Sequence, residues 1–343
     1  MNKQPYFSVI VPCWNCKKTI KRVLDSIVKQ LNEIDKDDIE VILMDDGHED
    51  NWPEEIEEYK DKLNIIYDQT KPHKIHCPGN TRRDALPLAT GQWILFCDND
   101  DFFQVGSFYK IKKEIETTNE KNVLATYAIE LDIDTYIGHF LDECITILHG
   151  KVYNRQFLIE NNINFKEDLE THEDLYFNTK VIGFLLKMGF EDFHWAEISS
   201  YVWVMRKDSI TRSFWSKPEE KNYLELHLQD YLSAYVDSYI SLWKDSLKNN
   251  EILKTHIMCS ILYAYFYYQG EIFRLGEEMS QSEYEIVKNH IYKIINECDI
   301  TKNDILKYIK ENAPIYHLIR EEIPKTEGDF VETISFPDFI KQI

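Results

Sequence analysis

Three carboxylates stand within four residues of one another, directly after a run of apolar residues. Asp98, Asp100 and Asp101 follow residues 93–97, which have the length and composition of a strand buried on both faces. Acids this close repel one another unless a cation lies among them, and a hard divalent ion such as Mg2+ or Mn2+ suits oxygen ligands. Because an isolated Asp-x-Asp pattern is short and common, a solvated acidic turn is the alternative interpretation.

Strand and helix patterns alternate through the N-terminal part of the chain. Apolar runs of strand length are followed by segments with apolar residues at helical spacing, such as Ile20, Val23, Leu24 and Ile27. This alternation predicts a parallel sheet with right-handed crossovers, in which every loop after a strand opens on the edge where ligands bind. The expected strands are residues 7–12, 39–44, 63–67 and 93–97, and the expected helices are 17–31, 53–60 and 80–90.

Aromatic and polar residues collect at this predicted edge. Pro12, Trp14 and Asn15 follow the first strand, and Asp46 follows the second. A nucleoside diphosphate needs an aromatic face for its base, acceptors for the base N–H and the ribose hydroxyls, and a cation for its pyrophosphate. The sequence contains neither GxGxxG nor GxxxxGK[ST], which argues against a dinucleotide-binding fold and a P-loop kinase.

Several segments resemble motifs of the family 2 glycosyltransferases of the GT-A fold. Residues 8–15 resemble the opening SVIIPxYN pattern, residues 41–47 the VDDGS pattern, and residues 82–101 the helix that leads through AxGxYIxFLDxDD. The resemblance implies an α/β, Rossmann-like GT-A fold with a mostly parallel sheet flanked by helices. Three later segments are also similar to parts of this family, namely 149–158, 164–177, which resembles the ED motif, and 201–211.

The chain departs from the family pattern at four positions. Arg83 stands where the family commonly has Asn, Ala85 where it has Gly, and His48 where it has Ser, while Trp14 stands in place of Tyr and is still aromatic. The changes around Arg83 bear on the choice of sugar rather than on the class of enzyme.

The resemblance implies a metal-dependent, inverting glycosyltransferase that uses Mn2+ or Mg2+. It assigns the metal to Asp100, as the direct ligand, and to Asp98, which in this family more often faces the ribose or the metal's water shell. Asp174 matches the family's catalytic base, and Glu173 is the fallback, since neighbouring helical residues point about 100° apart. The residues expected to bind the nucleotide sugar are Pro12, Trp14, Asn15, Asp46, Arg82, Asp98, Arg206 and Ser209.

The expected donor is a nucleoside-diphosphate sugar, with a UDP-sugar as the first choice. The expected acceptor is a hydroxyl group of a glycan or another molecule, and the resemblance favours a precursor of a surface polysaccharide or glycolipid. A protein or a modified base of phage DNA is the alternative acceptor.

Two other functions use part of the same pattern. A phosphatase of the haloacid dehalogenase type also has Asp-x-Asp after an apolar strand, but its first Asp usually lies near the N-terminus and precedes Thr, whereas Asp101 and Phe102 follow here. A nucleotide-sugar-binding protein without catalysis would have lost its base, and the presence of Glu173 and Asp174 argues against this.

Each assigned residue also has a structural interpretation. Asp46 is in a position to cap the following segment, and Arg206 to form a surface ion pair. Glu173 and Asp174 favour the start of a helix through its dipole, whatever their chemistry.

Cysteine and histidine pairs suggest other chemistry. Cys13 and Cys16 form a CxxC between a strand and a helix, which is the arrangement of thioredoxin-like redox sites, although the rest of the chain points elsewhere. His73, His76 and Cys77 are metal-ligand types without a fourth ligand nearby, so we interpret them as loop residues.

The composition limits the partners and the compartment. The chain has 343 residues with 43% hydrophobic content, and its 39 basic and 60 acidic residues give a formal charge of −21. This charge disfavours a nucleic acid partner without excluding it. No apolar run approaches the roughly 18 residues of a membrane span, and no signal-peptide region is visible. The seven cysteines are odd in number, as is common where thiols stay reduced. We therefore expect a cytoplasmic protein.

Residues beyond about 216 leave the family pattern and show helical spacing. We expect a GT-A catalytic domain over residues 1–215 and a helical C-terminal domain over residues 216–343. The helical domain either packs on the catalytic domain or serves acceptor binding or homo-oligomer formation. Its further expected helices are residues 252–273, 283–298 and 304–309. An irregular tail is expected from residue 324, with Phe336 and Phe339 packing back against the rest of the chain.

Overall fold

The computed structural model divides into two compact units, residues 1–213 and residues 214–343. The predicted boundary at 215/216 lies outside the described residues and stays a prediction. The structure describes residues 3–141, 144, 146–190, 192–206, 221–244, 253–255, 257, 258, 261, 265, 280–311, 338, 340 and 341.

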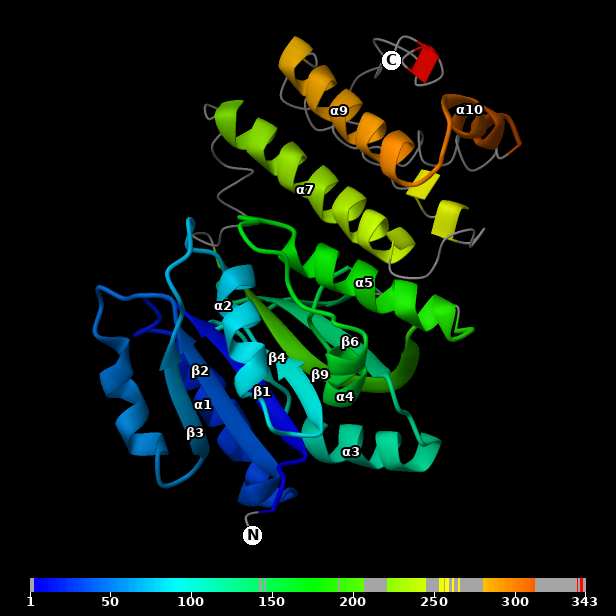
Figure 1. The fold of residues 1–343 in the computed structure, drawn as a ribbon. Helices are drawn as coiled ribbons and strands as arrows, with labels where there is room; N and C mark the ends of the chain where they lie inside the picture. Colours follow the sequence, from blue (N-terminus) through cyan, green and yellow to red (C-terminus); the bar gives the residue numbers. More distant parts are fainter. Residues whose placement is uncertain are drawn as a thin grey trace. The chain divides into compact units, whose positions relative to one another are not determined.

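Four parallel strands form the first half of the sheet in the N-terminal unit (Figure 1). Phe7 of the first strand pairs with Ile39 on one side and with Trp93 on the other. All four strands predicted from apolar runs are present, to within two residues at either end. They are β1 (Phe7–Cys13), β2 (Ile39–Asp45), β3 (Asn64–Gln69) and β4 (Trp93–Phe96), in the order β3-β2-β1-β4.

The helices between these strands are shorter than predicted. The segment expected over residues 80–90 forms α2 (Pro78–Ala85) and then one 3-10 turn, because Pro87 lacks the N–H that a continuing α-helix needs. Residues 17–31 contain α1 (Ile20–Val28), which continues as a 3-10 turn. The segment expected over 53–60 is a 3-10 helix, Trp52–Tyr59.

The second half of the sheet changes direction. β8 runs antiparallel to both β4 and β6, whereas β6 and β9 are parallel to each other, so the complete sheet is mixed. The further elements are β5 (Phe102–Phe103), α3 (Ser107–Thr118), β6 (Val123–Asp132), β7 (Gly138–Leu141), β8 (Lys151–Asn154), α4 (Arg155–Glu160), α5 (Glu173–Lys187) and β9 (His194–Met205).

This reversal decides which residues meet at the ligand edge. The sheet continues in the order β4-β8-β6-β9-β5, with β7 paired to β6. Because β8 is antiparallel to β4, the residues before β8 lie at the edge where β4 ends. The residues after β6 and β9 reach the same edge, since these two strands run in the direction of β4.

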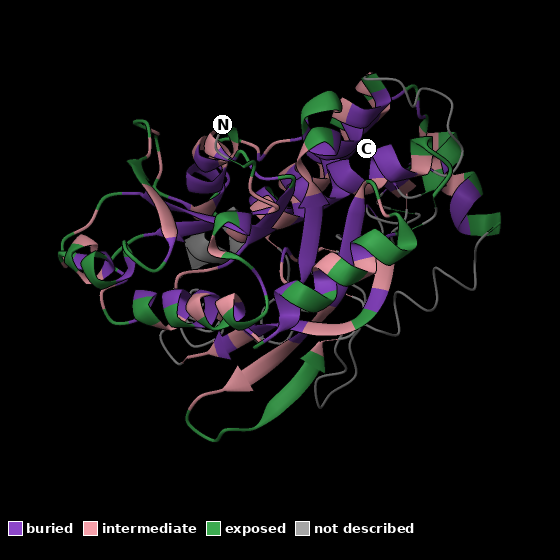
Figure 2. Cartoon of the chain, turned by 90° about the horizontal axis from the view of Figure 1, so that it is seen from below, coloured by how far each residue is buried: buried purple, intermediate pink, exposed green. Residues whose placement is uncertain are grey.

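A buried carboxylate aligns the start of β4 with β1 and β2. Glu40 accepts hydrogen bonds from the Ser8 hydroxyl at 2.5 Å and from the backbone N–H groups of Thr90 at 2.6 Å and Gly91 at 3.0 Å. A side chain at Gly91 would collide with Ser8, so the chain passes closely here. β1, β2 and β4 are buried along their whole length, and buried strands form the interior in Figure 2. This alignment fixes where the acidic loop after β4 begins.

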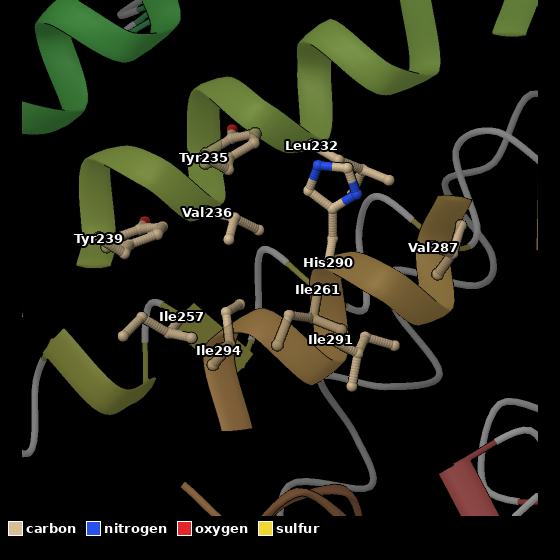
Figure 3. A pocket seen from close by; sticks show the side chains of 10 residues that line it. All are labelled: Leu232, Tyr235, Val236, Tyr239, Ile257, Ile261, Val287, His290, Ile291 and Ile294. Carbon is tan, nitrogen blue, oxygen red and sulfur yellow. The ribbon is translucent and has the colours of Figure 1, made fainter. Parts of the chain in front are cut away.

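The C-terminal unit is helical in the part that the structure describes. The described helices are α7 (Lys221–Leu242), α9 (Gln281–Glu297) and α10 (Lys302–Glu311). α9 corresponds to the helix predicted over 283–298, and α10 contains the one predicted over 304–309. Leu232 and Tyr239 of α7 and Ile291 of α9 line a small apolar pocket (Figure 3). Much of the helix predicted over 252–273, and Phe336 and Phe339 of the tail, lie outside the described residues.

Within the described parts of the chain, no helix combines the length and the apolar character needed to cross a membrane.

Candidate active site

The loop after β4 is fixed from beneath by β9. Asp101 is fully buried and accepts hydrogen bonds from the Tyr201 hydroxyl at 2.6 Å and from the Val204 backbone N–H at 2.8 Å. The same hydroxyl accepts a hydrogen bond from the backbone N–H of Asp98 at 3.1 Å. Burial, and then the charges of Asp98 and Asp100, hold the pKa of Asp101 well above its ordinary value. The loop is therefore held in one conformation by groups from a distant strand.

Arg82 of α2 joins this loop to the start of α5. Its guanidinium is buried and donates to Asp98 and, at 2.6 Å, to Glu173. Burial alone would raise the pKa of Asp98, but Arg82 and His149 outweigh it and hold that pKa well below the ordinary value. Asp98 is thus ionised throughout the pH range in which an enzyme of this kind would work.

Asp100 and Arg206 form an ion pair at the other end of the loop. The guanidinium of Arg206 donates to the Asp100 carboxylate at 2.6 Å, and Arg22 donates to the Asp100 backbone oxygen at 2.7 Å. Burial and the charge of Asp98 raise the pKa of Asp100 in spite of Arg206. Arg206 directly follows β9 and contacts this loop through Asp100, and its predicted place near the donor diphosphate stays a prediction. Ser209, predicted beside it, is outside the described residues.

His149 meets the acids from the start of β8. Its Nε2 atom lies 3.6 Å from the Asp98 carboxylate and 3.8 Å from the Asp101 carboxylate, and its ring stacks on Tyr201 at 4.6 Å. Asp98, Asp101 and His149 each offer one ligand atom, all within 4.8 Å of one another. Two carboxylates and an imidazole are ligands for a divalent cation, so this loop fits one. The predicted pair of ligands was Asp98 and Asp100, and this set contains only the first.

Sequence reasoning missed His149 because it looked only at residues that follow strands. In an antiparallel strand, the residue before its start reaches the same edge. The change of direction at β8 was not visible in the apolar pattern, since a buried strand has the same composition in either direction.

The loop after β1 offers an aromatic face. Trp14 is 57% exposed, and Asn15 adopts a left-handed conformation with φ of 45° while its side-chain oxygen accepts the Glu49 backbone N–H at 2.8 Å. The backbone oxygen of Pro12 accepts a hydrogen bond from the Asn99 side chain at 3.0 Å, which ties this loop to the acidic loop.

The two acids at the end of β2 have different environments. Asp45 is fully buried and is bonded to the Tyr67 hydroxyl at 2.7 Å, the Trp52 indole N–H at 3.3 Å and the His48 ring at 2.6 Å. Its two oxygens therefore have three protein partners, which suits a structural role.

Asp46 has a more open carboxylate. Its Oδ1 atom accepts the Thr70 hydroxyl at 3.0 Å and lies 3.3 Å from the His76 ring, and its backbone N–H donates to Cys13 at 2.8 Å. Among the described residues, the side-chain contacts of Asp46 are made through this one oxygen.

Glu173 and Asp174 open α5, but their contacts differ. Glu173 accepts the Arg82 guanidinium, whereas Oδ1 of Asp174 accepts the backbone N–H of Leu175 at 2.7 Å. Burial, and then the charge of Glu173, raises the pKa of Asp174 to about 7. A carboxyl group that titrates near neutrality is well suited to proton transfer.

The cysteine pair lies beneath the loop after β1. Cys13 and Cys16 are 1% and 2% exposed, and burial raises the pKa of Cys13 well above its ordinary value. A buried thiol with a raised pKa is inert, so this environment does not favour a redox role. His73 is bonded to Asp84 at 2.9 Å, in keeping with its interpretation as a loop residue.

Comparison with known proteins identifies one sequence family. The family described as "Glycosyl transferase family 2" matches residues 8–183, about half of the chain. Poly(ribitol-phosphate) beta-N-acetylglucosaminyltransferase TarS of Staphylococcus aureus is 29% identical over 185 residues, which cover 51% of this chain and 32% of that protein. The chain therefore spans about a third of the length of this relative.

Two other comparisons extend over nearly the whole chain. The minor teichoic acid biosynthesis protein GgaA of Bacillus subtilis is 23% identical over 350 residues, which cover 94% of this chain and 73% of that protein. The crystal structure of S. aureus TarS 1-349 in complex with UDP-GlcNAc matches with a TM-score of 0.66 at 20% identity, covering 96% of this chain and 95% of that one. At this identity the likeness concerns the fold, and it confirms the predicted α/β GT-A class with its helical C-terminal region.

Proposed function

Because this chain belongs to glycosyl transferase family 2, we propose that it transfers a sugar from a nucleoside-diphosphate sugar to an acceptor hydroxyl group. The observation that carries the proposal is the pair of contacts made by Arg82, to Asp98 on the acidic loop and to Glu173 beside Asp174. One buried guanidinium thus connects a loop that fits a cation to the first residue of α5, next to Asp174, whose pKa is about 7. A single displacement needs both, one to stabilise the leaving diphosphate and the other to accept a proton.

The nucleotide is proposed to bind across the ends of β1 and β2. Trp14 offers its exposed face for stacking on the base, and Asp46 offers a carboxylate oxygen to a base N–H. Asn15 and the backbone of Pro12 border the same loop and complete the predicted set. Uracil carries such an N–H, which is one reason to keep a UDP-sugar as the first choice of donor.

The diphosphate is proposed to lie against the acidic loop. A divalent cation bound there, Mn2+ or Mg2+, would supply positive charge that stabilises the leaving group. Asp98 and Asp100 are the ligands predicted from the sequence. Arg206, held beside Asp100, brings a second positive charge to the same oxygens, and Ser209 stays a predicted contact.

Asp174 is proposed to act as the base. Its pKa of about 7 lets it exist as a carboxylate near neutral pH and still accept a proton from the attacking hydroxyl. Glu173 is less suited because its carboxylate is already bonded to the Arg82 guanidinium. A single displacement inverts the anomeric centre, so an α-linked donor would give a β-linked product.

The acceptor is proposed to be a precursor of a cell-surface polymer. The printed names of TarS and GgaA refer to poly(ribitol-phosphate) and to teichoic acid, and this supports a polyol or glycan hydroxyl as the acceptor. The same proposal includes three further points. The protein is located in the cytoplasm, its two domains divide at 215/216, and it forms a homo-oligomer through the helical domain.

A thermal-shift panel tests the donor side without an acceptor. The chain is heated with UDP-, GDP-, dTDP- and CDP-linked sugars, each with Mn2+, Mg2+ or EDTA. A ligand at 100 times its Kd adds about 2.7 kcal/mol to the stability of the native state. We expect stabilisation by one nucleotide series, and its loss in Trp14→Ala. Tyr109→Ala is the matched control, because Tyr109 is an exposed aromatic residue on α3. Stabilisation by none of the four series would contradict the proposal.

A further inference from the structure

The hairpin of β6 and β7 exposes two aromatic side chains. Tyr136 is 81% exposed and Phe140 is 70% exposed, the two largest fractions among the large apolar residues that the structure describes. The loop between the strands is held by hydrogen bonds. The backbone N–H of Tyr136 donates to the Asp132 backbone oxygen at 2.8 Å, and Oδ1 of Asp132 accepts the backbone N–H groups of Asp134 at 2.9 Å and Thr135 at 3.0 Å. The exposed rings therefore stand on a hairpin with a defined conformation.

The backbone of Tyr136 has an unfavourable conformation for its residue type. Its φ of 59° lies in the left-handed region, which Gly, Asn and Asp adopt more easily than a bulky residue. A ring exposed to this degree gains little from packing in the core that would offset the cost. An outlier of this kind points to a role of the side chain in binding rather than in folding.

One face of β6 is the face that α5 covers. The ring of Tyr153 in β8 packs on Phe177 of α5 at 5.2 Å, and its hydroxyl donates to Asn178 of the same helix at 2.7 Å. Tyr153 pairs with Val123 of β6, and cross-strand partners lie on the same face of a sheet. Because α5 carries Asp174 in its first turn, this is also the side of the sheet on which the proposed base lies.

Phe140 extends this face outward along the hairpin. Alternate residues of a strand share a face, so Ile129 lies on the same side as Val123. Leu124 and Ala128 both belong to one core cluster on the opposite side, so the alternation along β6 is unbroken. Phe140 is the partner of Ile129 in β7 and therefore lies on the side of the sheet that α5 covers.

The hairpin begins beside the acidic loop. Asp132, at the end of β6, pairs with Met205 at the end of β9. Arg206 is the next residue after Met205 and donates to Asp100 at 2.6 Å. The aromatic face of the hairpin is therefore continuous with the candidate active site and leads away from it.

The charge of the hairpin limits what can bind to it. Residues 122–150 contain no Lys or Arg, and the hairpin carries Glu130, Asp132 and Asp134. A phosphate-bearing polymer or an anionic membrane would be repelled by these acids. A neutral sugar ring suits both features of the hairpin, because its C–H face is apolar and packs on an aromatic ring, while its hydroxyl groups donate to carboxylates.

We propose that Phe140 and Tyr136 bind neutral sugar rings of the acceptor, so that the acceptor presents a glycan and not a polyol phosphate to this hairpin. The inference rests on the proposed function, since the rings belong to the molecule that receives the transferred sugar. Phe140 contacts a ring nearer to the reacting hydroxyl group, and Tyr136 contacts one farther out, at the tip of the hairpin.

The test is saturation-transfer difference NMR on the full chain with UDP and Mn2+. The probes are the neutral trisaccharides maltotriose, cellotriose, mannotriose and chitotriose, with ribitol 5-phosphate as the anionic comparison. We expect a trisaccharide to bind, and Phe140→Ala to raise its Kd by about two- to tenfold. Tyr109→Ala is the matched control, because it removes an exposed aromatic ring from α3, and it should leave this Kd unchanged.

Tyr136→Asn separates binding from folding. Asparagine adopts the left-handed region more easily than tyrosine, so the variant should unfold at the wild-type temperature or above it. The trisaccharide should nevertheless bind more weakly to this variant. A purely structural role of the tyrosine ring would instead lower the unfolding midpoint and leave the affinity unchanged.

The inference is overturned if no trisaccharide binds, if Phe140→Ala binds as tightly as the wild type, or if ribitol 5-phosphate binds more tightly than the trisaccharides. The proposed function has a separate readout, the thermal shift by nucleotide sugars, which neither hairpin variant should change. If a nucleotide sugar binds and no trisaccharide does, the inference fails and glycosyl transfer still stands. If a trisaccharide binds through Phe140 and no nucleotide sugar binds, the proposed function fails and the hairpin remains a sugar-binding surface.

Discussion

Replacing Asp174 with asparagine has two expected effects of opposite sign, one on turnover and one on stability. Asparagine has the same shape and its oxygen still accepts the Leu175 N–H, so the fold should persist. Its amide cannot take a proton from the acceptor, and loss of a general base lowers turnover by roughly 100- to 10,000-fold. Donor binding should be unchanged, because this carboxyl group contacts the acceptor and not the nucleotide in our proposal.

The stability effect follows from the raised pKa of Asp174. The ordinary value is 3.8 and the folded value is about 7, so between these pH values the folded chain holds a proton that the unfolded chain has released. Stability therefore falls as pH rises through this window and stays lower above it. At about 1.4 kcal/mol per unit over about three units, the upper bound is about 4 kcal/mol, and partial exposure of the side chain reduces it to roughly 1 to 4 kcal/mol.

Asp174→Asn removes this cost, so the variant should be more stable than the wild type at pH 8 and nearly equal to it at pH 4. Unfolding midpoints at the two pH values measure the difference, and Glu170→Gln, which changes an exposed acid of the same segment, is the control. In the wild type, kcat/KM should rise with pH up to about pH 7 and then level off. Unchanged turnover would refute the role as base. A stability difference that is the same at pH 4 and pH 8 would refute the buried ionisation on which the reasoning rests.

Three further substitutions probe the frame of the site. Arg82→Met leaves two carboxylates without their buried partner and should cost about 3 to 5 kcal/mol in urea unfolding. Arg83→Met loses a half-exposed ion pair and one hydrogen bond to the Phe165 backbone oxygen and should cost about 1 to 2 kcal/mol. Tyr201→Phe removes the hydroxyl that is bonded to the acidic loop and should lower the free energy of unfolding by about 1 to 3 kcal/mol. Mn2+ binding, measured in a titration, should also weaken, and an unaltered affinity would show that the loop keeps its conformation without this hydroxyl. Gly150→Ala would press a methyl group onto a backbone oxygen of β6 and should lower the unfolding midpoint far more than Gly189→Ala, whose φ is also positive but which faces open space.

The first half of the fold was predictable because β1, β2 and β4 are mostly apolar runs with a polar loop behind them. Phe7–Cys13 and Ile39–Asp45 are buried along their whole length, so their pattern has one interpretation, and parallel pairing follows from the helices between them. The loop after β4 was found for the same reason.

The rest of the site depends on contacts between residues far apart in the sequence. The hydrogen bond from Tyr201 to Asp101 joins positions 100 residues apart, and Arg82 meets Glu173 across 91 residues. Neither pair has a local pattern, because a buried tyrosine hydroxyl and a buried guanidinium are defined by partners that only the folded chain brings near. His149 was missed through strand direction, which composition does not reveal.

The guanidinium of Arg82 makes two equilibria of the enzyme interdependent. The charge on Asp98 raises the pKa of Asp174, and the charge on Arg82 lowers it. Any positive charge that arrives at Asp98 therefore lowers the affinity of Asp174 for its proton, and by thermodynamic reciprocity loss of that proton strengthens binding at Asp98. The enzyme would then release a fraction of a proton as it takes up a cation at this loop, so that its base loses its proton mainly when the charge that stabilises the leaving group is already in place.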